Sequence, residues 1–156
     1  MADVTFQFDT QGYMDAVIRG AHFGLIQLGR EMQGEIRKEL SQPGTGRHHT
    51  SWGLKYRSSA PGQPPAAQSG RLRNSWLSSG MPRVRNNEMT IKVASNVRYA
   101  RILQYGGFAG RRRSVKIEPR PYINRPFATV SQWAAYVLRD KIYDRIEAIN
   151  RGRKER

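Results

Sequence analysis

The feature that most constrains the fold is a pair of long segments, one near each end of the chain, with apolar residues at helical spacing. In the first segment the apolar residues recur at steps of three and four: Met14, Ile18, Ala21, Leu25, Leu28, Met32, Ile36 and Leu40. In the second they begin just after Arg125: Phe127, Val130, Ala134, Val137, Leu138, Ile142, Ile146 and Ile149. This periodicity predicts two long amphipathic helices, the first of about 28 residues, with Asp9 or Thr10 as its cap.

The first predicted helix contains an unusual number of glycines: Gly12, Gly20, Gly24, Gly29 and Gly34. Each glycine weakens an isolated helix by up to about 1 kcal/mol relative to alanine. We therefore expect this helix to be held by packing, and its small residues would let another backbone approach closely.

Shorter elements are predicted around and between the two helices. Alternation of Val4, Phe6 and Phe8 predicts a first strand, and a hairpin is expected where residues 76–85 and 89–93 flank the turn sequence "RNNE". A short helix is expected in "NVRYARILQYGG", ended by its glycines, with a final strand near "SVKIEP". These elements predict one α+β domain over residues 1–150, with two long helices packed on a small antiparallel sheet and a frayed basic tail at 151–156.

The segment 41–68 is rich in turn-forming residues, with four prolines and four glycines and no sustained periodicity. We predict a long extended loop or arm, because an irregular segment of this length is usually functional. Trp52, Leu54 and Tyr56 alternate, which indicates a short strand or a docking arm. A flap over the domain's own core and an arm that docks on a neighbouring molecule are equally compatible with this pattern.

Positive charge is concentrated in the middle of the chain. The formal net charge is +15, and residues 47–125 hold 16 arginines and lysines against two glutamates. Such a block favours a polyanionic partner, most commonly nucleic acid. A basic surface that only keeps the protein soluble is the alternative.

The composition excludes some classes of protein. Because cysteine is absent, no disulfide framework or thiolate metal site can form, which is compatible with a reducing cytosol. No run of about 18 apolar residues is present, and the start "MADVTFQFDTQGY" lacks the pattern of a signal peptide. We expect a soluble protein with no membrane partner.

Catalytic chemistry is poorly represented, and we expect a protein that is not an enzyme and has no metal or cofactor. Glu88 and Glu118 are the only carboxylates in the basic block, too few for the ligands of a metal-dependent nuclease. His48 and His49 are adjacent and would face opposite ways on a strand. The segment "GTGRHH" lacks the ending of a phosphate-binding loop.

Three separated motifs follow one another in the order seen in a known family. They are "APGQPPAAQSGRLRNSW", "VRYARILQYGG" and "IEPRPYINRPF". Together they resemble the neck proteins of tailed phages of the siphophage, lambdoid type, described as minor tail, tail-completion or head-tail joining proteins. The residues that carry the resemblance are Pro64, Pro65, Ser69, Gly70, Leu72, Arg73, Tyr99, Ala100, Gln104, Gly106, Arg120, Pro121 and Tyr122. Gln104 stands where that family often has glutamate, and the arginine run enlarges the basic loop 106–116.

The resemblance implies a structural virion protein without enzymatic activity. It implies a homo-oligomeric ring, expected to be a hexamer, that is made in the host cytoplasm and joins head connector and tail around the DNA channel. The expected partners are connector, tail terminator or tail tube proteins, and the backbone of the genomic DNA. A free-standing module that binds nucleic acid without sequence specificity is the alternative, and an assembly factor absent from the finished virion is a third candidate.

Individual side chains have predicted roles within this framework. Ser69 can cap the turn that follows it, Leu72 can enter the core, and Pro121 fixes the backbone before the last helix. For Arg73 and Arg120, internal bonds that hold the fold are favoured over direct contact with DNA. The predicted DNA-facing or partner-facing residues, on the hairpin and the basic loop, are Arg83, Arg85, Arg111, Arg112, Arg113 and Lys116. Acidic faces of neighbouring ring proteins are the alternative partner for these cations.

Overall fold

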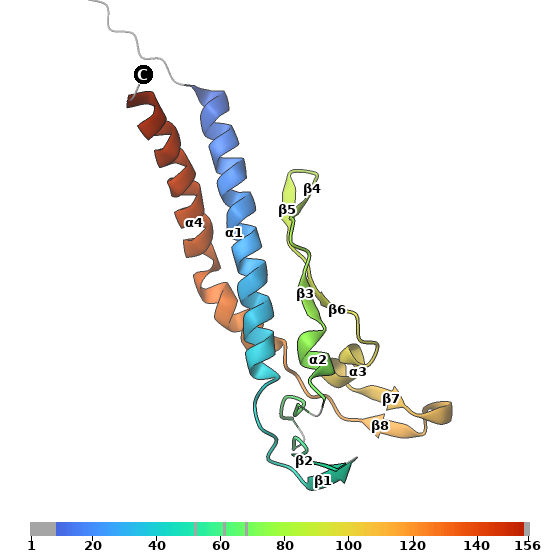
Figure 1. Ribbon diagram of the computed structural model, residues 1–156. Helices are drawn as coiled ribbons and strands as arrows, with labels where there is room; N and C mark the ends of the chain where they lie inside the picture. The colour runs from blue at the N-terminus through green and yellow to red at the C-terminus, as the bar shows by residue number, and fades with distance from the viewer. Residues whose placement is uncertain (1–8, 52, 61, 68, 155–156) are drawn as a thin grey trace, which may run out of the picture.

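The computed structural model describes residues 9–51, 53–60, 62–67 and 69–154 of the 156-residue chain. Two long helices run side by side, and the segment between them forms short antiparallel strand pairs around one end of the helical pair (Figure 1). The predicted α+β class is confirmed. The strand predicted at Val4, Phe6 and Phe8 lies outside the described residues.

The first helix, α1, spans Thr10–Glu39 and begins at a predicted cap. The Asp9 carboxylate accepts a hydrogen bond from the backbone N–H of Gly12 at 2.9 Å. An aspartate at this position satisfies one of the N–H groups that have no partner within the first turn of a helix.

The last helix, α4, spans Asn124–Lys154 and lies antiparallel to α1 (Figure 1). The Tyr13 hydroxyl, near the start of α1, donates a hydrogen bond to Asn150 Oδ1 at 2.6 Å, near the end of α4. Residues 151–154, which the sequence places in a frayed tail, are helical in this structure. No described helix combines the length and the apolar character needed to cross a membrane.

Small residues form the part of α1 that meets α4. Ala16, Gly20, Gly24 and Leu28 recur at every fourth position and are buried. The predicted apolar stripe joins this seam at Leu28, whereas the first half of the stripe lies beside the seam and is exposed: Ile18 is 48 % exposed. The face of α1 that contains the glycines packs against α4 because glycine has no side chain, which lets the backbones of the two helices approach closely.

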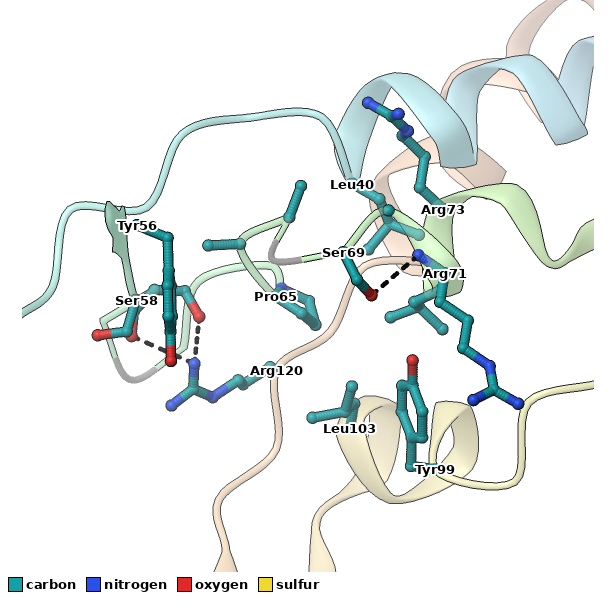
Figure 2. A pocket seen from close by; sticks show the side chains of 15 residues that line it. Leu40, Tyr56, Ser58, Pro65, Ser69, Arg71, Arg73, Tyr99, Leu103 and Arg120 are labelled. Carbon is teal, nitrogen blue, oxygen red and sulfur yellow. Dashed lines mark hydrogen bonds between the residues drawn. The ribbon is translucent and has the colours of Figure 1, made fainter. Parts of the chain in front are cut away.

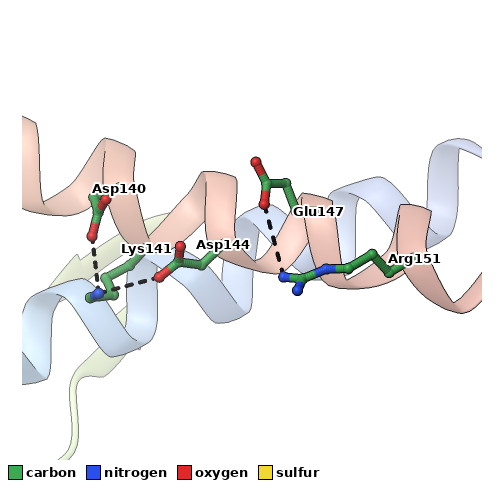
Figure 3. Close-up of polar contacts among 5 residues, drawn as sticks. All are labelled: Asp140, Lys141, Asp144, Glu147 and Arg151. Carbon is green, nitrogen blue, oxygen red and sulfur yellow. Dashed lines mark hydrogen bonds and ion pairs between the residues drawn. The ribbon is translucent and has the colours of Figure 1, made fainter.

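Ion pairs along α4 are arranged within single turns of the helix (Figure 3). Lys141 Nζ lies 3.0 Å from Asp140 Oδ2 and 3.3 Å from Asp144 Oδ2. Its hydrogen bond to Asp140 is the main cause that raises the pKa of Lys141, followed by its bond to Asp144. Glu147 and Arg151 form a looser pair at 3.9 Å. Exposed pairs of this kind contribute little to stability.

The region between the long helices, residues 40–123, is called the head. Among its described residues there are four antiparallel pairs of strands and not the single small sheet that the sequence predicts. The pairs are β1 (His48–Ser51) with β2 (Leu54–Arg57), β3 (Trp76–Ser78) with β6 (Val93–Ser95), β4 (Arg83–Arg85) with β5 (Glu88–Thr90), and β7 (Gly107–Ala109) with β8 (Val115–Ile117). The β3–β6 pair is the one that packs against α1.

The β4–β5 hairpin confirms the turn predicted at "RNNE". Asn86 and Asn87 both have a positive φ, 48° and 61°, as the tight hairpin turn requires. Arg85 therefore pairs directly with Glu88 in the ladder. Asparagine tolerates this left-handed conformation better than most residues, so the turn could be found from the sequence.

Two short helices and a helical turn complete the head. They are α2 (Arg71–Asn74), α3 (Ala100–Tyr105) and a 3-10 turn at Arg111–Arg113. α3 ends at Gly106, whose φ is 76°, as its glycine predicted. The predicted basic loop 106–116 is the two-stranded β7–β8 hairpin with the three arginines at its tip.

The predicted arm at 41–68 also contains regular structure. β1 and β2 pair within it, so the strand indicated by Leu54 and Tyr56 is confirmed. Residue 52 lies outside the described residues, and so nothing follows for Trp52. After β2 the chain runs irregularly back toward α2.

Two apolar clusters hold the helices and the head together. Leu28, Val130 and Val137 form one between α1 and α4. The other joins α1 to the head: Ile36, Leu40, Trp76 and Tyr122. Most of these residues belong to the predicted stripes, whereas Phe127, also in a predicted stripe, is exposed.

Candidate functional site

The buried amide of Gln104 joins α3 to the start of α4. Its Oε1 accepts hydrogen bonds from the backbone N–H groups of Tyr122 at 2.9 Å and Ile123 at 3.2 Å. Its Nε2 donates to Asn124 Oδ1 at 2.9 Å. Because glutamine both accepts and donates, it satisfies all three groups, which an ionised glutamate could not do. Gln104 therefore acts inside the fold.

Tyr122 is part of the same framework and is almost completely buried. Its hydroxyl donates to the carbonyl oxygen of Ala100 at 3.0 Å, and its ring meets that of Trp76 edge to face with centroids 5.9 Å apart. Burial is the main cause that raises the pKa of Tyr122 to about 12. This tyrosine is a structural residue that stays neutral.

Arg120 ties the irregular arm to the head (Figure 2). Its Nη1 donates to the carbonyl oxygen of Ser59 at 3.2 Å and also to the Ser59 hydroxyl. Its own backbone N–H donates to the carbonyl oxygen of Leu103 at 2.7 Å. The prediction that Arg120 holds the fold by internal bonds is confirmed.

The "SGRLR" turn differs in detail from its prediction. Gly70, with φ 71°, is the residue that precedes α2, and Ser69 Oγ accepts only a long 3.4 Å bond from the Arg71 N–H. Leu72 is partly buried against the core, as predicted. Arg73 makes long contacts with Ser41 and Asn74, at 3.5 and 3.4 Å, so its internal bonds are weaker than those of Arg120.

Around these motifs lies a cavity of about 370 Å³ (Figure 2). Segments far apart in the sequence line it: the end of α1, β2, the arm, α2, α3 and the residues before α4. Its described lining is Leu40, Tyr56, Ser58, Ser59, Pro65, Ala66, Ala67, Ser69, Gly70, Arg71, Leu72, Arg73, Tyr99, Leu103 and Arg120. The lining thus combines apolar side chains with three arginines, and its described part contains no acidic residue.

The remaining motif residues support the framework or its surface. Ala100 is buried at the start of α3, and Tyr99, just before it, is exposed at the cavity. Pro121 is exposed and Pro64 half-buried. At Gly106 an added Cβ would lie 3.0 Å from the carbonyl oxygen of Ile117, so glycine fits both the turn and this close approach.

No protein-family model matches the chain, and no significant match is found among curated proteins or solved structures. The interpretation of the site therefore rests on the residues and their geometry.

The basic residues predicted to face DNA or a partner lie on two separate hairpins, β4–β5 and β7–β8 (Figure 1). Arg83 and Arg85 are exposed on β4, whereas Arg111 and Arg112 are exposed at the tip of the β7–β8 hairpin. For Arg113 the structure describes the backbone only. Lys116 on β8 forms an ion pair with Glu118 at 3.0 Å. Within one chain, these basic residues therefore do not share a single face.

The predicted docking residues of the arm have different surroundings. The Tyr56 ring stacks on His49 of the paired strand, with centroids 5.3 Å apart, and Tyr56 also lines the cavity. Leu54 is paired with Ser51 through the ladder, and the structure describes no more than its backbone.

Several cavity residues were not found from the sequence. Ser59, the partner of Arg120, lies in an irregular segment where no periodicity distinguishes one serine from another. Leu40 and Leu103 belong to apolar patterns that predict burial and not a cavity wall. Within the described part of the chain, no cluster of three or more histidine or acidic side chains is placed to bind a metal ion.

Proposed function

We propose that the chain is a structural protein of the junction between the head and the tail of a tailed phage, where copies of it assemble as a ring around the DNA channel. The observation that carries this proposal is the apolar surface on the first half of α1 that the described residues leave uncovered. Met14, Val17 and Ile18 are 59, 38 and 48 % exposed. Contiguous apolar surface of this kind is typical of protein-protein interfaces.

The projecting hairpins support assembly with other molecules. All three residues of β4 are exposed, and Phe108 and Val115 expose more than half of their surface on the β7–β8 hairpin. A two-stranded hairpin that stands alone is marginally stable in water. Contacts with neighbouring copies would stabilise both hairpins and cover their apolar side chains.

The motif residues act mainly inside each copy. Gln104, Arg120 and Tyr122 form the internal framework that positions α3, the arm and α4. Residues of this kind set the fold of each copy, so the surfaces outside the framework remain for contacts with neighbours.

Solution measurements test the assembly. We expect the purified protein to form a discrete oligomer in native mass spectrometry, and Ile18→Glu to shift it to smaller species because it places a charge in an apolar interface. Arg30→Gln is the matched control, since it changes the net charge equally at an exposed polar position of the same helix. A wild-type protein that stays monomeric at high concentration would contradict the ring.

Particle analysis tests the location. The chain is expected in purified virions, at the neck beside connector, tail terminator or tail tube proteins, and its loss should leave heads and tails unjoined. Complete particles that lack the chain would identify an assembly factor instead.

The second candidate function is nucleic-acid binding without sequence specificity. The positive charge of the region between the two long helices of this chain favours it. Residues 47–125 hold 16 arginines and lysines against two glutamates. Affinity for duplex DNA should fall steeply with salt, and the double substitution Arg111→Gln with Arg112→Gln should reduce the slope by about 2. Tight DNA binding by a strict monomer that joins no particle would favour this function over the ring.

A further inference from the structure

We propose that the cavity between the arm, α2 and α3 is a docking site for a partner protein that inserts an aspartate or glutamate flanked by apolar residues. The proposal concerns one chain and goes beyond ring assembly, because every described residue that lines the cavity belongs to a single copy. It therefore stands whether or not copies of the chain associate.

The cations of the cavity lack acidic partners within the described chain. Arg71, Arg73 and Arg120 all line it, and no described carboxylate forms an ion pair with any of them. Arg120 uses Nη1 for both of its side-chain bonds to Ser59, which leaves its Nη2 donors for a ligand. A guanidinium group presents paired donors that match the two oxygens of a carboxylate.

Figure 2 shows how the charged groups are placed. Arg120 and Arg71 lie on either side of Leu103 in this view, and Tyr99 stands next to Arg71. Arg73 points toward α1, away from Pro65. Arg71 is exposed, and its guanidinium group makes no hydrogen bond or ion pair within the described chain, so we assign it as the cation that a ligand reaches first.

The apolar part of the lining decides between a peptide and DNA. Leu72, Leu103 and Pro65, which are only partly buried, lie in the same cavity as the arginines. A sugar-phosphate backbone offers nothing to cover these side chains, whereas a peptide with apolar residues next to its carboxylate gains from their burial as well as from the charge.

An unbiased selection tests the proposal with the full-length protein. Immobilised wild-type protein is used to select from a library of random dodecapeptides, with and without an excess of a 12-base-pair DNA duplex. We expect the selected peptides to be enriched in aspartate or glutamate next to leucine, isoleucine or phenylalanine. Their enrichment should persist in the presence of DNA.

Matched variants assign binding to the cavity. Arg71→Gln should lower the affinity for the selected consensus peptide by about 10-fold or more, because a hydrogen-bonded charge pair is lost. The affinity of Arg71→Lys for the peptide should lie between those of the wild type and Arg71→Gln, since lysine keeps the charge without the planar pair of donors. Arg85→Gln is the control, with the same change of charge on the distant β4–β5 hairpin, and should bind as the wild type does.

Three outcomes would overturn the proposal: no peptide selected, peptides without acidic residues, or equal binding by Arg71→Gln and Arg85→Gln. Displacement of the peptide by DNA through Arg71 would assign the cavity to phosphates and would also overturn it. Unfolding does not confuse the result, because each variant is first checked for an unchanged thermal midpoint. Oligomer size, measured on the same samples, reports separately on the ring.

Discussion

Gly20 of α1 lies directly against Ile142 of α4: a Cβ atom added to Gly20 would be 2.5 Å from the Ile142 Cα. At Gly24, one turn further along, an added Cβ would be 2.9 Å from a methyl carbon of Leu138. The two helices therefore meet backbone to backbone at this seam, and the glycines that weaken an isolated α1 are what permit its packing.

Alanine at Gly20 should destabilise the protein, whereas alanine at Gly34 should stabilise it. Gly20→Ala places a methyl group against the backbone of Ile142. We expect a net loss of stability of about 1 to 2 kcal/mol after the gain in helix propensity. At Gly34 an added Cβ meets nothing within 4 Å, so Gly34→Ala should gain about 1 kcal/mol. Urea unfolding of both variants measures these changes, and a stabilised Gly20→Ala would show that the seam is not tight.

Replacement of Gln104 should separate its acceptor role from its donor role. Gln104→Leu leaves the N–H groups of Tyr122 and Ile123 without an acceptor and should cost about 1 to 3 kcal/mol for each buried group. Gln104→Glu keeps the acceptor at the start of α4, where negative charge is favourable, and loses the bond to Asn124 alone. In chemical denaturation, the free energy of unfolding should be highest for the wild type, lower for Gln104→Glu and lowest for Gln104→Leu. Equal losses for the two variants would contradict the acceptor role.

Loss of the Arg120 side chain should release the arm and leave most of the fold intact. Arg120→Gln removes the bonds to Ser59, and amide exchange in residues 58–67 should rise by about tenfold, which corresponds to about 1.4 kcal/mol. Hydrogen-deuterium exchange with mass spectrometry measures the rate, and Arg98→Gln, at an exposed position of the head, is the control. Unchanged exchange in the arm would mean that Arg120 does not hold it.

Tyr122 should make the stability depend on pH in the alkaline range. Its pKa is about 12 in the folded protein and 10 in the unfolded chain, so the folded state favours the neutral phenol. This contribution is complete below pH 10 and is lost as the pH rises through about 12. Thermal midpoints between pH 9 and 12 should fall less steeply for Tyr122→Phe, although that variant loses the bond to Ala100 at every pH. Parallel pH curves for the two proteins would contradict a buried, neutral phenol.

Local chemistry made much of the fold predictable. The cap at Asp9, the paired asparagines at 86 and 87, and the helix end at Gly106 are each decided by a few neighbouring residues. The two long helices could be found because their apolar residues keep a helical spacing over about 20 residues or more, which short strands and loops do not. The same reasoning predicted that Arg120 holds the fold, although it could not find Ser59 as its partner.

Other properties depended on how distant segments meet. The cavity between the arm, α2 and α3 follows from the meeting of distant segments that no periodicity specifies. The division of the head into separate strand pairs has the same origin.

The sequence by itself therefore determined the two long helices, the cap of α1 at Asp9 and the tight turn at Asn86 and Asn87, because these depend on the local pattern of neighbouring residues. The glycines of α1 predicted the close approach of another backbone, but only the tertiary structure decided that α4 is this neighbour, that Gly20 and Gly24 meet it, and that Ile18 stays exposed. The physical reason is that hydrophobicity ranks side chains by their transfer from water, whereas packing selects the face that allows the closest approach of two backbones.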